Sequence, residues 1–318
     1  MKVPSWAALL NRNAALLRQA ARPLGERYRP PPGAGSWLMG LVMAADGPRR
    51  YYLFRPAGVR FGEKLPLLVM LHGCHQDART FAASTRMNSL AAKERFLVLY
   101  PEQPRLANAQ GCWHWFDLRG GRAQGEVAWI MKAIAQVGLL YAARRDATAV
   151  AGLSAGASMA ALLATKHPEK FRAVVMHSGV PPGMADTPAA ALGAMRGRRE
   201  ALAPASSGPL PPLLVIHGDG DGVVSPRNAA AAAQQWAAAA DAQAGTPQQQ
   251  RRGTRHPMTV TQYRHGGRLA ATWVEVHGLG HAWSGGAAHQ RFGDAQGPDA
   301  SRMVWRFVAQ ALEAPPGG

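Results

Sequence analysis

A succession of short, uninterrupted apolar runs limits the fold of this chain more than any other feature of its sequence. The clearest are L-P-L-L-V-M-L at 65–71, F-L-V-L-Y at 96–100, A-V-V-M at 173–176 and L-L-V-I at 213–216. Runs without polar alternation are typical of strands buried on both faces, as in parallel sheets. Segments with helical apolar spacing lie between them, as at 125–137. The pattern predicts an α/β fold with a single doubly wound, mostly parallel sheet and helices on both faces.

The remaining elements follow from the same reasoning. Alternating or β-branched segments around glycine turns predict two strand pairs, at 36–43 with 49–56 and at 258–264 with 268–276. Apolar spacing predicts helices at about 78–93, after Ser154 as far as Thr165, in the first half of 229–253, and at 298–312. In an open sheet of this kind, ligands bind beyond the carboxyl ends of the strands.

Composition excludes several broad classes. The formal net charge is +17, but the basic residues are scattered, and only the N-terminus and R-R-G-T-R-H at 251–256 are clustered. Nucleic acid is therefore not an expected partner, because no interleaved basic and aromatic motif is present. No apolar run is long enough for a membrane span. The two cysteines, Cys74 and Cys112, are either buried thiols or one disulfide.

The most informative motif is G-L-S-A-G, with Ser154 between Gly152 and Gly156. It follows a predicted strand and precedes a predicted helix. Small neighbours let the strand and helix approach closely while the serine hydroxyl projects into solvent, as in a nucleophile elbow. The alternative is a simple serine helix cap. The strand–turn–helix context favours Ser154 as a catalytic nucleophile.

A serine nucleophile needs a histidine base and a carboxylate that orients it, which in this fold follow in the order Ser, Asp or Glu, His. Two aspartates compete in H-G-D-G-D-G at 217–222. Asp219 comes directly after the strand, where turn formation is its expected role. Asp221 projects from the loop, so we favour Asp221 as the catalytic acid.

Two histidines compete for the base in H-G-L-G-H at 277–281. His277 lies at the strand end, where a packed, hydrogen-bonded role suits it. His281 lies in a glycine-rich loop that can reach across the strand ends, so we favour His281. A metal site is disfavoured because the spacings match no common ligand pattern. No metal is therefore expected.

The oxyanion of an acyl-transfer intermediate needs two backbone N–H donors. We expect one from Ala155, after the nucleophile, and the other from Cys74, with His75 as second choice. Trp113, Trp115 and Trp283 lie in the motif loops. They are candidates for an apolar substrate-binding wall, with core packing as an equal alternative.

Several motifs occur together and in order: L-H-G-C-H-Q, G-C-W-H-W-F-D, G-L-S-A-G, H-G-D-G-D-G and G-L-G-H-A-W-S-G-G. Over roughly 36–312 the chain resembles the poly(3-hydroxybutyrate) depolymerase-like esterases, which are related to feruloyl and acetylxylan esterases. The resemblance implies an α/β-hydrolase fold and a cofactor-free serine esterase with Ser154, Asp221 and His281 as its triad. It also implies a disulfide between Cys74 and Cys112.

The chain departs from the family pattern in places. Ala157 and Ser158 follow the elbow where a further glycine is usual, and His114 stands where asparagine is common. The resemblance implies an extracellular or periplasmic protein. The N-terminus shows no clear signal peptide, so the cytoplasm remains an alternative.

These observations predict the domain organisation. A basic leader at 1–35, poorly ordered or forming a surface helix, precedes the α/β-hydrolase catalytic domain at 36–313. Within the domain, 179–211 is expected to cover the site and 241–258 to be a surface insertion. A short tail follows at 314–318.

The predicted function is hydrolysis of carboxylic esters through an acyl-enzyme, acting on poly(3-hydroxybutyrate)-type polyesters, their oligomers or short-chain esters. A feruloyl or acetylxylan esterase is the nearest alternative. More distant alternatives are a non-catalytic binding protein on a hydrolase scaffold and a basic protein that binds nucleic acid or granules. Oligomeric state and acyl chain length are not fixed by the sequence.

Overall fold

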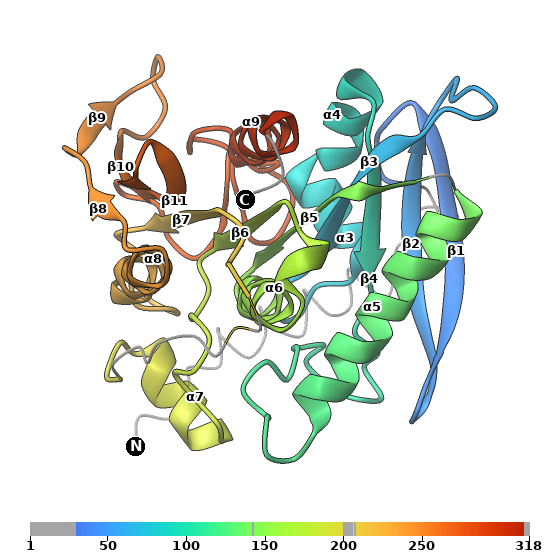
Figure 1. The fold of residues 1–318 in the computed structure, drawn as a ribbon, viewed down its shortest axis with the longest axis horizontal. Coiled ribbons are helices and arrows are strands. Elements are labelled where there is room, and N and C mark those ends of the chain that lie inside the picture. Colours follow the sequence, from blue (N-terminus) through green and yellow to red (C-terminus); the bar gives the residue numbers. More distant parts are fainter. Residues whose placement is uncertain (1–29, 142, 200–205, 207, 315–318) are drawn as a thin grey trace, which may run out of the picture.

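One central sheet organises the chain in the computed structural model, which describes residues 30–141, 143–199, 206 and 208–314 (Figure 1). Its eleven strands follow the order β1-β2-β4-β3-β5-β6-β7-β11-β10-β8, and β9 also pairs with β10. The six strands from β4 to β11 are parallel, and antiparallel strands extend the sheet at both edges. The mostly parallel sheet with helices is the predicted α/β-hydrolase fold.

The strands have the following bounds: β1 Gly35–Ala44, β2 Gly47–Pro56, β3 Leu65–Leu71, β4 Leu97–Pro101, β5 Ala143–Leu153, β6 Ala173–His177, β7 Leu213–Gly218, β8 Gln243–Ala244, β9 Gln248–Gln250, β10 Met258–His265, β11 Arg268–Val276. A separate pair consists of β12 Trp283–Ser284 and β13 Gly293–Asp294. The helices are α3 Ala78–Thr85, α4 Met87–Glu94, α5 Arg122–Leu140, α6 Ala155–Lys166, η1 Pro168–Lys170, α7 Pro188–Met195, α8 Arg227–Ala239 and α9 Ala300–Glu313.

The sheet separates two hydrophobic cores. Successive residues of β3 alternate between them, with Leu67 and Val69 in one core and Leu68 and Met70 in the other. Helices α5, α6 and α8 cover the first core, and α3, α4 and α9 cover the second. The continuous apolar run of β3 therefore has a physical cause, because both faces of the strand are excluded from water.

The prediction of a single helix at 78–93 is wrong, because the segment forms two helices. It is divided into α3 and α4 at Arg86, whose φ of 55° is left-handed. The Arg86 N–H donates to the carbonyl of Ala82, which ends α3. Helix α3 begins at a capping box in which Asp77 and Thr80 exchange hydrogen bonds.

The segments outside the central pattern lie at the periphery. Residues 179–211 contain α7, although 200–205 and 207 lie outside the described residues, so the predicted covering role stays a prediction. In 241–258, β8 and β9 add exposed strands beside β10. The predicted leader as far as residue 29, and the tail from 315, also lie outside the described residues.

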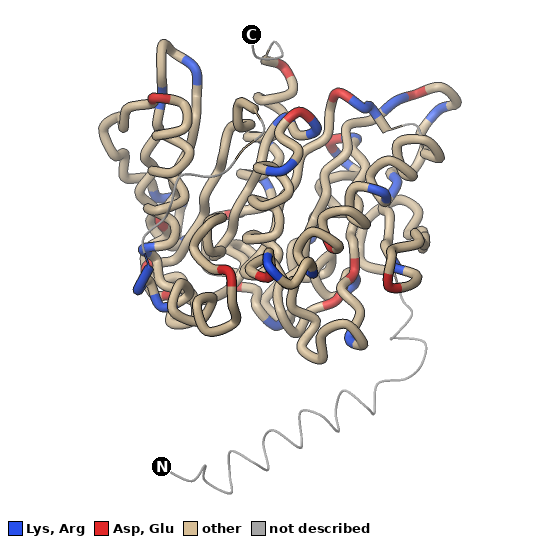
Figure 2. The backbone as a smooth tube through the Cα atoms, turned by 60° about the horizontal axis from the view of Figure 1, so that its bottom comes forward, with Lys and Arg blue, Asp and Glu red and all other residues tan. Residues whose placement is uncertain are grey.

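Two further observations concern the basic residues and the helices. Figure 2 shows lysine and arginine distributed over several parts of the molecule. None of the helices in the described part of the chain combines the length and the apolar character that crossing a bilayer requires.

Candidate active site

Parallel strands bring the predicted site residues to one edge of the sheet. Cys74 follows β3, Ser154 follows β5, Asp221 follows β7 and His281 follows β11. Strands β3, β5, β6, β7 and β11 are consecutive neighbours and run in the same direction. Residues distant in sequence therefore lie beyond the same carboxyl ends, as expected for a ligand site in this type of sheet.

Both glycines of the elbow are required by the close approach of strand and helix. A Cβ at Gly152 would lie 2.3 Å from the backbone of Gly156, and a Cβ at Gly156 would lie 2.2 Å from the carbonyl oxygen of Leu71. Contacts of this length are not tolerated against rigid backbone. Strand β5, helix α6 and the end of β3 can therefore pack together only because these two side chains are absent.

Ser154 occupies the tight turn between β5 and α6. Its φ of 56° is unusual for a residue with a side chain. The Ser154 N–H donates to the His177 carbonyl at 2.8 Å, and the Ser154 carbonyl accepts from Ala157 and Ser158 in the first turn of α6. Ser154 is only partly buried while its neighbours along the chain are buried. The turn thus holds a hydroxyl at the surface end of a buried strand.

Asp221 and His281 form a close pair between the loops after β7 and β11. Asp221 Oδ2 lies 2.7 Å from His281 Nδ1. The Asp221 side chain is fully buried and that of His281 is 10% exposed. Because Nδ1 faces the carboxylate, the second ring nitrogen, Nε2, is directed away from Asp221.

Asp221 is fixed by more than this histidine. Its Oδ1 accepts hydrogen bonds from the backbone N–H groups of Val223 and Val224, each at 2.9 Å. Its Oδ2 lies 3.2 Å from Nε2 of the buried His217. Burial acts to raise the pKa of Asp221, but the hydrogen bonds from His217 and His281 outweigh it and hold that pKa well below its ordinary value. The carboxylate is therefore charged and oriented at neutral pH.

A second pair lies beside the first. Asp219 Oδ2 is 2.9 Å from His277 Nδ1, and Asp219 Oδ1 accepts from the Gly278 N–H at 2.7 Å. His277 Nε2 lies 2.9 Å from the Thr259 hydroxyl. Both ring nitrogens of His277 are therefore occupied, and the pair ties the ends of β7, β10 and β11 together.

Two backbone donors beside the elbow are unpaired, one in the loop after β3 and one at the start of α6. Among the described residues, neither the Cys74 N–H nor the Ala155 N–H has a hydrogen-bond acceptor. The His75 N–H, by contrast, donates to the Gln110 carbonyl at 2.6 Å. Gly73 lies against the elbow, since a Cβ placed on it would lie 3.5 Å from the Ser154 Cβ. Of the two alternatives in this loop, the Cys74 N–H is the one left free.

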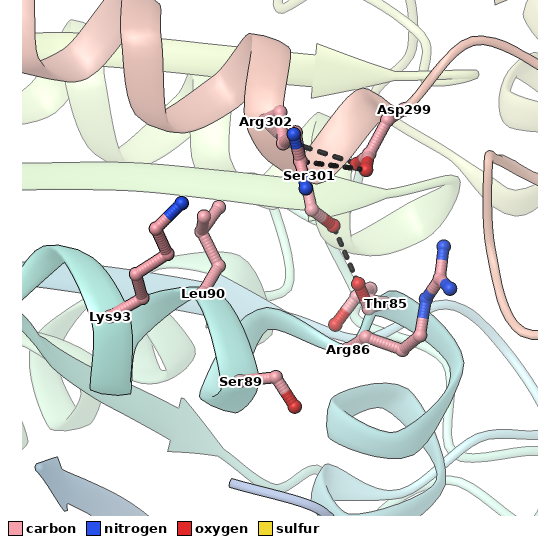
Figure 3. Close-up of a pocket in the computed structure, with 8 residues that line it drawn as sticks. All are labelled: Thr85, Arg86, Ser89, Leu90, Lys93, Asp299, Ser301 and Arg302. Carbon is pink, nitrogen blue, oxygen red and sulfur yellow. Dashed lines mark hydrogen bonds and ion pairs between the residues drawn. The ribbon is translucent and has the colours of Figure 1, made fainter.

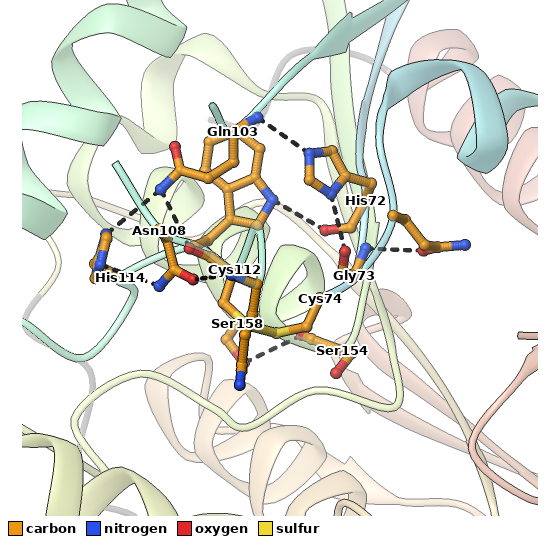
Figure 4. The surroundings of a disulfide bond; sticks show 12 residues. His72, Gly73, Cys74, Gln103, Asn108, Cys112, His114, Ser154 and Ser158 are labelled. Carbon is orange, nitrogen blue, oxygen red and sulfur yellow. Dashed lines mark hydrogen bonds between the residues drawn. A yellow bond between two sulfur atoms is a disulfide. The ribbon is translucent and has the colours of Figure 1, made fainter. Parts of the chain in front are cut away.

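A disulfide joins the same loop to a second one. Cys74 and Cys112 are bonded, with their Cα atoms 4.4 Å apart, and Figure 4 shows the bond next to Ser154. Behind it, Trp113 Nε1 donates to the His72 carbonyl at 2.9 Å. Two loops are thus fastened together beside the elbow.

A buried polar network supports the disulfide loop. His114 Nδ1 lies 2.7 Å from Glu126 on α5, and the His114 N–H donates to the other oxygen of this carboxylate at 2.8 Å. Gln103 donates from its backbone to His72 and from its side chain to the Cys112 carbonyl (Figure 4). The histidine at the position where asparagine is common therefore has a carboxylate partner.

The structure corrects two of the three tryptophan candidates. Trp113 and Trp283 are fully buried, and their indole N–H groups donate to His72 and Ser301. A ring with no exposed surface cannot contact substrate, so both belong to the core. Trp115 is 9% exposed and packs edge-on against Phe116, and its predicted role stays a prediction.

The sequence reasoning missed His177 and His217. His177 ends β6, stacks on Trp283 with ring centroids 5.0 Å apart, and accepts from the Ser284 N–H at 3.1 Å. Burial, with the neighbouring His217 and His281, lowers the pKa of His177 to about 3, so it is neutral. The signal was present, since M-H-S-G and I-H-G both end buried strands with a histidine.

The chain is similar in sequence to one family of esterases. The family model described as "Esterase PHB depolymerase" matches residues 49–256. Poly(3-hydroxyalkanoate) depolymerase C of Paucimonas lemoignei is 31% identical over 179 residues, which are 51% of this chain and 42% of that protein. Feruloyl esterase B of Neurospora crassa is 29% identical over 213 residues, covering 59% of this chain and 68% of that protein. The match to the depolymerase thus spans less than half of its length.

Solved structures support the fold. An acetyl xylan esterase from Aspergillus awamori has a TM-score of 0.65 at 18% identity, covering 85% of this chain and 99% of that one. An acylaminoacyl peptidase from Pyrococcus horikoshii has a TM-score of 0.58 at 13% identity, covering 93% of this chain and 44% of that one. At such identities the likeness concerns the arrangement of sheet and helices.

Proposed function

Since the chain belongs to the Esterase PHB depolymerase family, we propose that it is a serine hydrolase of carboxylic esters with Ser154 as nucleophile, His281 as base and Asp221 as acid. One observation carries the proposal. The buried Asp221 carboxylate holds His281 by Nδ1 at 2.7 Å, beyond the same strand ends as the Ser154 elbow. The Asp221 carboxylate thus orients the His281 ring by Nδ1 and leaves Nε2 available as the base.

The reaction begins with attack of Ser154 Oγ on the ester carbonyl carbon, while His281 Nε2 accepts the hydroxyl proton. Asp221 stabilises the imidazolium that results. Collapse of the tetrahedral intermediate breaks the ester C–O bond, and His281 returns the proton to the leaving alkoxide. Water, deprotonated by His281, then attacks the acyl-enzyme and releases the acid with Ser154 restored.

The oxyanion of each tetrahedral intermediate is held by the backbone N–H groups of Cys74 and Ala155. Both lack an acceptor among the described residues, which leaves them free for a substrate oxygen. The Ala155 donor also lies in the first turn of α6, where the helix dipole favours negative charge. Removing one such donor from an oxyanion hole costs on the order of 3 kcal/mol of barrier. The disulfide of Cys74 supports the position of its loop.

The test uses p-nitrophenyl acetate and butyrate. Ser154→Ala is expected to lower kcat/KM by about 10⁴-fold or more, with an unchanged unfolding temperature. A fluorophosphonate probe should label the wild-type protein at Ser154 and leave the variant unlabelled. Hydrolysis by the variant at the wild-type rate would remove the mechanism, and an unlabelled, inactive wild type would favour a binding protein on this scaffold.

For the substrate, we propose poly(3-hydroxybutyrate)-type polyesters, their oligomers or short-chain esters. The family and the similarity to poly(3-hydroxyalkanoate) depolymerase C support this class. Feruloyl and acetylated sugars are the alternative, supported by the similarity to feruloyl esterase B. Rates on hydroxybutyrate oligomers, feruloylated sugars and acetylxylan, measured side by side, separate the two.

For the location, we propose an extracellular or periplasmic compartment. The Cys74–Cys112 disulfide supports it, because such bonds persist mainly where the surroundings are oxidising. Thiol counting on protein isolated from its native source under rapid alkylation tests this. Two free thiols per chain would place the protein in a reducing compartment instead.

A further inference from the structure

A cavity of about 510 Å³ lies between helix α9 and the sheet edge formed by β10 and β11, apart from the candidate active site. Ser154, Asp221 and His281 do not line it. Its volume falls in the range typical of small-molecule sites. The cavity has a floor and a rim of opposite character, and the chain segments that form them are far apart in sequence.

The floor is a mainly apolar face of the sheet. Cross-strand register places Gln262, Thr272 and Leu214 in one row across β10, β11 and β7. Val260 and Val274 are opposite each other in the next row. Further apolar side chains come from Met258, Leu269, Met303 and Phe307. An aliphatic chain can therefore lie on this surface with little contact to water.

The rim is strongly basic. Arg302 and Arg306 are four residues apart on α9, so they extend from the same helix face, and Arg252 and Arg255 come from the loop after β9. The one carboxylate in the lining, Asp299, pairs with Arg302. In the described part of the chain, neither Arg252 nor Arg306 has a carboxylate partner.

Thr272 provides a second, independent observation. It is 93% buried in the middle strand of the floor, with a relative exposure of 7%. Its hydroxyl has no hydrogen-bond partner among the described residues. Buried hydroxyl groups are nearly always paired, so this unpaired one in the cavity wall is available to a polar atom of a ligand.

We infer that this cavity binds an aliphatic carboxylate, with the anionic head between the arginines of the rim and the chain on the apolar floor. Guanidinium groups suit carboxylates because they donate two parallel hydrogen bonds. The acids released by carboxylic-ester hydrolysis belong to this chemical class. The inference does not depend on the roles proposed for Ser154 and His281.

A smaller cavity of about 200 Å³ offers a natural comparison, since it shares Asp299 and Arg302 (Figure 3). It lies between α9 and the α3–α4 junction, where Arg86 donates to the Gly285 carbonyl and the Ser301 hydroxyl donates to the Thr85 carbonyl at 2.6 Å. Lys93 lines this cavity but not the larger one, so its replacement is a matched control.

The test is calorimetric titration of the full chain with decanoate at low ionic strength. Arg252→Ala and Arg306→Ala should each weaken binding about fivefold or more, because each removes a charge-assisted contact. Thr272→Val keeps the side-chain shape and removes the hydroxyl, so binding should weaken about threefold without loss of thermal stability. Lys93→Ala and His281→Ala should change the affinity by less than about twofold.

Each other outcome overturns the inference. Equal decanoate binding by the arginine variants, with unchanged unfolding temperatures, would exclude this cavity. Loss of binding in His281→Ala alone would assign the ligand to the candidate active site. If decanol binds as tightly as decanoate, the cavity does not recognise the carboxylate. If inorganic phosphate binds as tightly, the cavity does not recognise the aliphatic chain.

Discussion

The Asp221–His281 pair and the Asp219–His277 pair lie side by side and share the same chemistry, but their surroundings differ. The oxygen–nitrogen distances are 2.7 and 2.9 Å. The side chains of Asp221 and His281 are 0% and 10% exposed, whereas those of Asp219 and His277 are 41% and 34% exposed. Charge interactions strengthen as water is excluded, so the first pair is the stronger electrostatic unit.

The free ring nitrogen separates the pairs further. His277 Nε2 is held by Thr259, while His281 Nε2 has no partner among the described residues. A general base needs an unoccupied nitrogen within reach of the proton that it accepts. A carboxylate–histidine contact alone therefore does not define a catalytic pair, as three predictions on these residues test; a fourth concerns the buried His177.

The largest contrast is expected between the two histidines. His281→Ala should lower kcat/KM on p-nitrophenyl butyrate by about 10⁴-fold or more, because the proposed mechanism assigns the Ser154 proton to His281. His277→Ala should change it by less than about fivefold and lower the unfolding temperature slightly. Equal losses in the two variants, with both folded, would contradict the assignment.

The carboxylates should follow the same order. Asp221→Asn is expected to lower kcat by about 10³- to 10⁴-fold, because an amide stabilises the wrong tautomer of His281 and no imidazolium. Asp219→Asn should retain activity within a few-fold. Steady-state kinetics and circular dichroism on both variants check this, and a nearly inactive but folded Asp219→Asn would reverse the roles.

A smaller effect is expected from the buried His217, whose Nε2 lies 3.2 Å from Asp221 Oδ2 and supports that carboxylate. His217→Gln should lower kcat about tenfold while KM changes less than twofold, because a less well held carboxylate misaligns His281. Thr259→Val is the matched change in the second pair and should leave kcat unaltered. A loss that appears in KM alone would argue for a different role of His217.

The fourth prediction concerns stability against acid rather than a rate. The pKa of His177 is lowered to about 3 in the folded protein from an ordinary value near 6.5, so the unfolded chain binds the extra proton first. Stability from this group is present above pH 6.5 and is lost as pH falls from there toward 3. The loss is at most about 1.4 kcal/mol per pH unit.

Denaturant unfolding between pH 6.5 and 4.5 measures this slope, in a window above the ordinary pKa values of most carboxylates. His177→Gln should flatten the dependence of unfolding free energy on pH. The exposed His277→Gln is the control and should leave the slope close to that of the wild type. Parallel curves for all three proteins would show that His177 does not dominate acid sensitivity.

Much of the fold and several contacts follow from local sequence. The apolar runs predicted the mostly parallel sheet, because a strand covered on both faces must lack polar residues. The glycines around Ser154 predicted a close strand–helix approach. The reason is that a Cβ added to Gly152 would lie only 2.3 Å from the backbone of Gly156. The helix break at Arg86 was not predicted, because neither glycine nor proline marks this left-handed position in the sequence.

The tryptophans and histidines required the tertiary structure. Trp113 and Trp283 lie in motif loops, yet their rings pack into different cores, which no local pattern records. His177 and His217 acquire their roles only from strands brought together by the sheet. The cavity beneath α9 combines residues from β7, β9, β10, β11 and α9, so no single segment carries its signature.

By itself, the sequence determined the α/β class, the elbow at Ser154 and the small set of residues from which an acid and a base could come. Those properties depend on neighbours along the chain, through side-chain periodicity and backbone sterics. Tertiary structure alone decided which aspartate is shielded from water, which histidine keeps a free nitrogen and which tryptophans are inaccessible. Burial and pairing are properties of the assembled sheet, because they are set by residues far away in sequence.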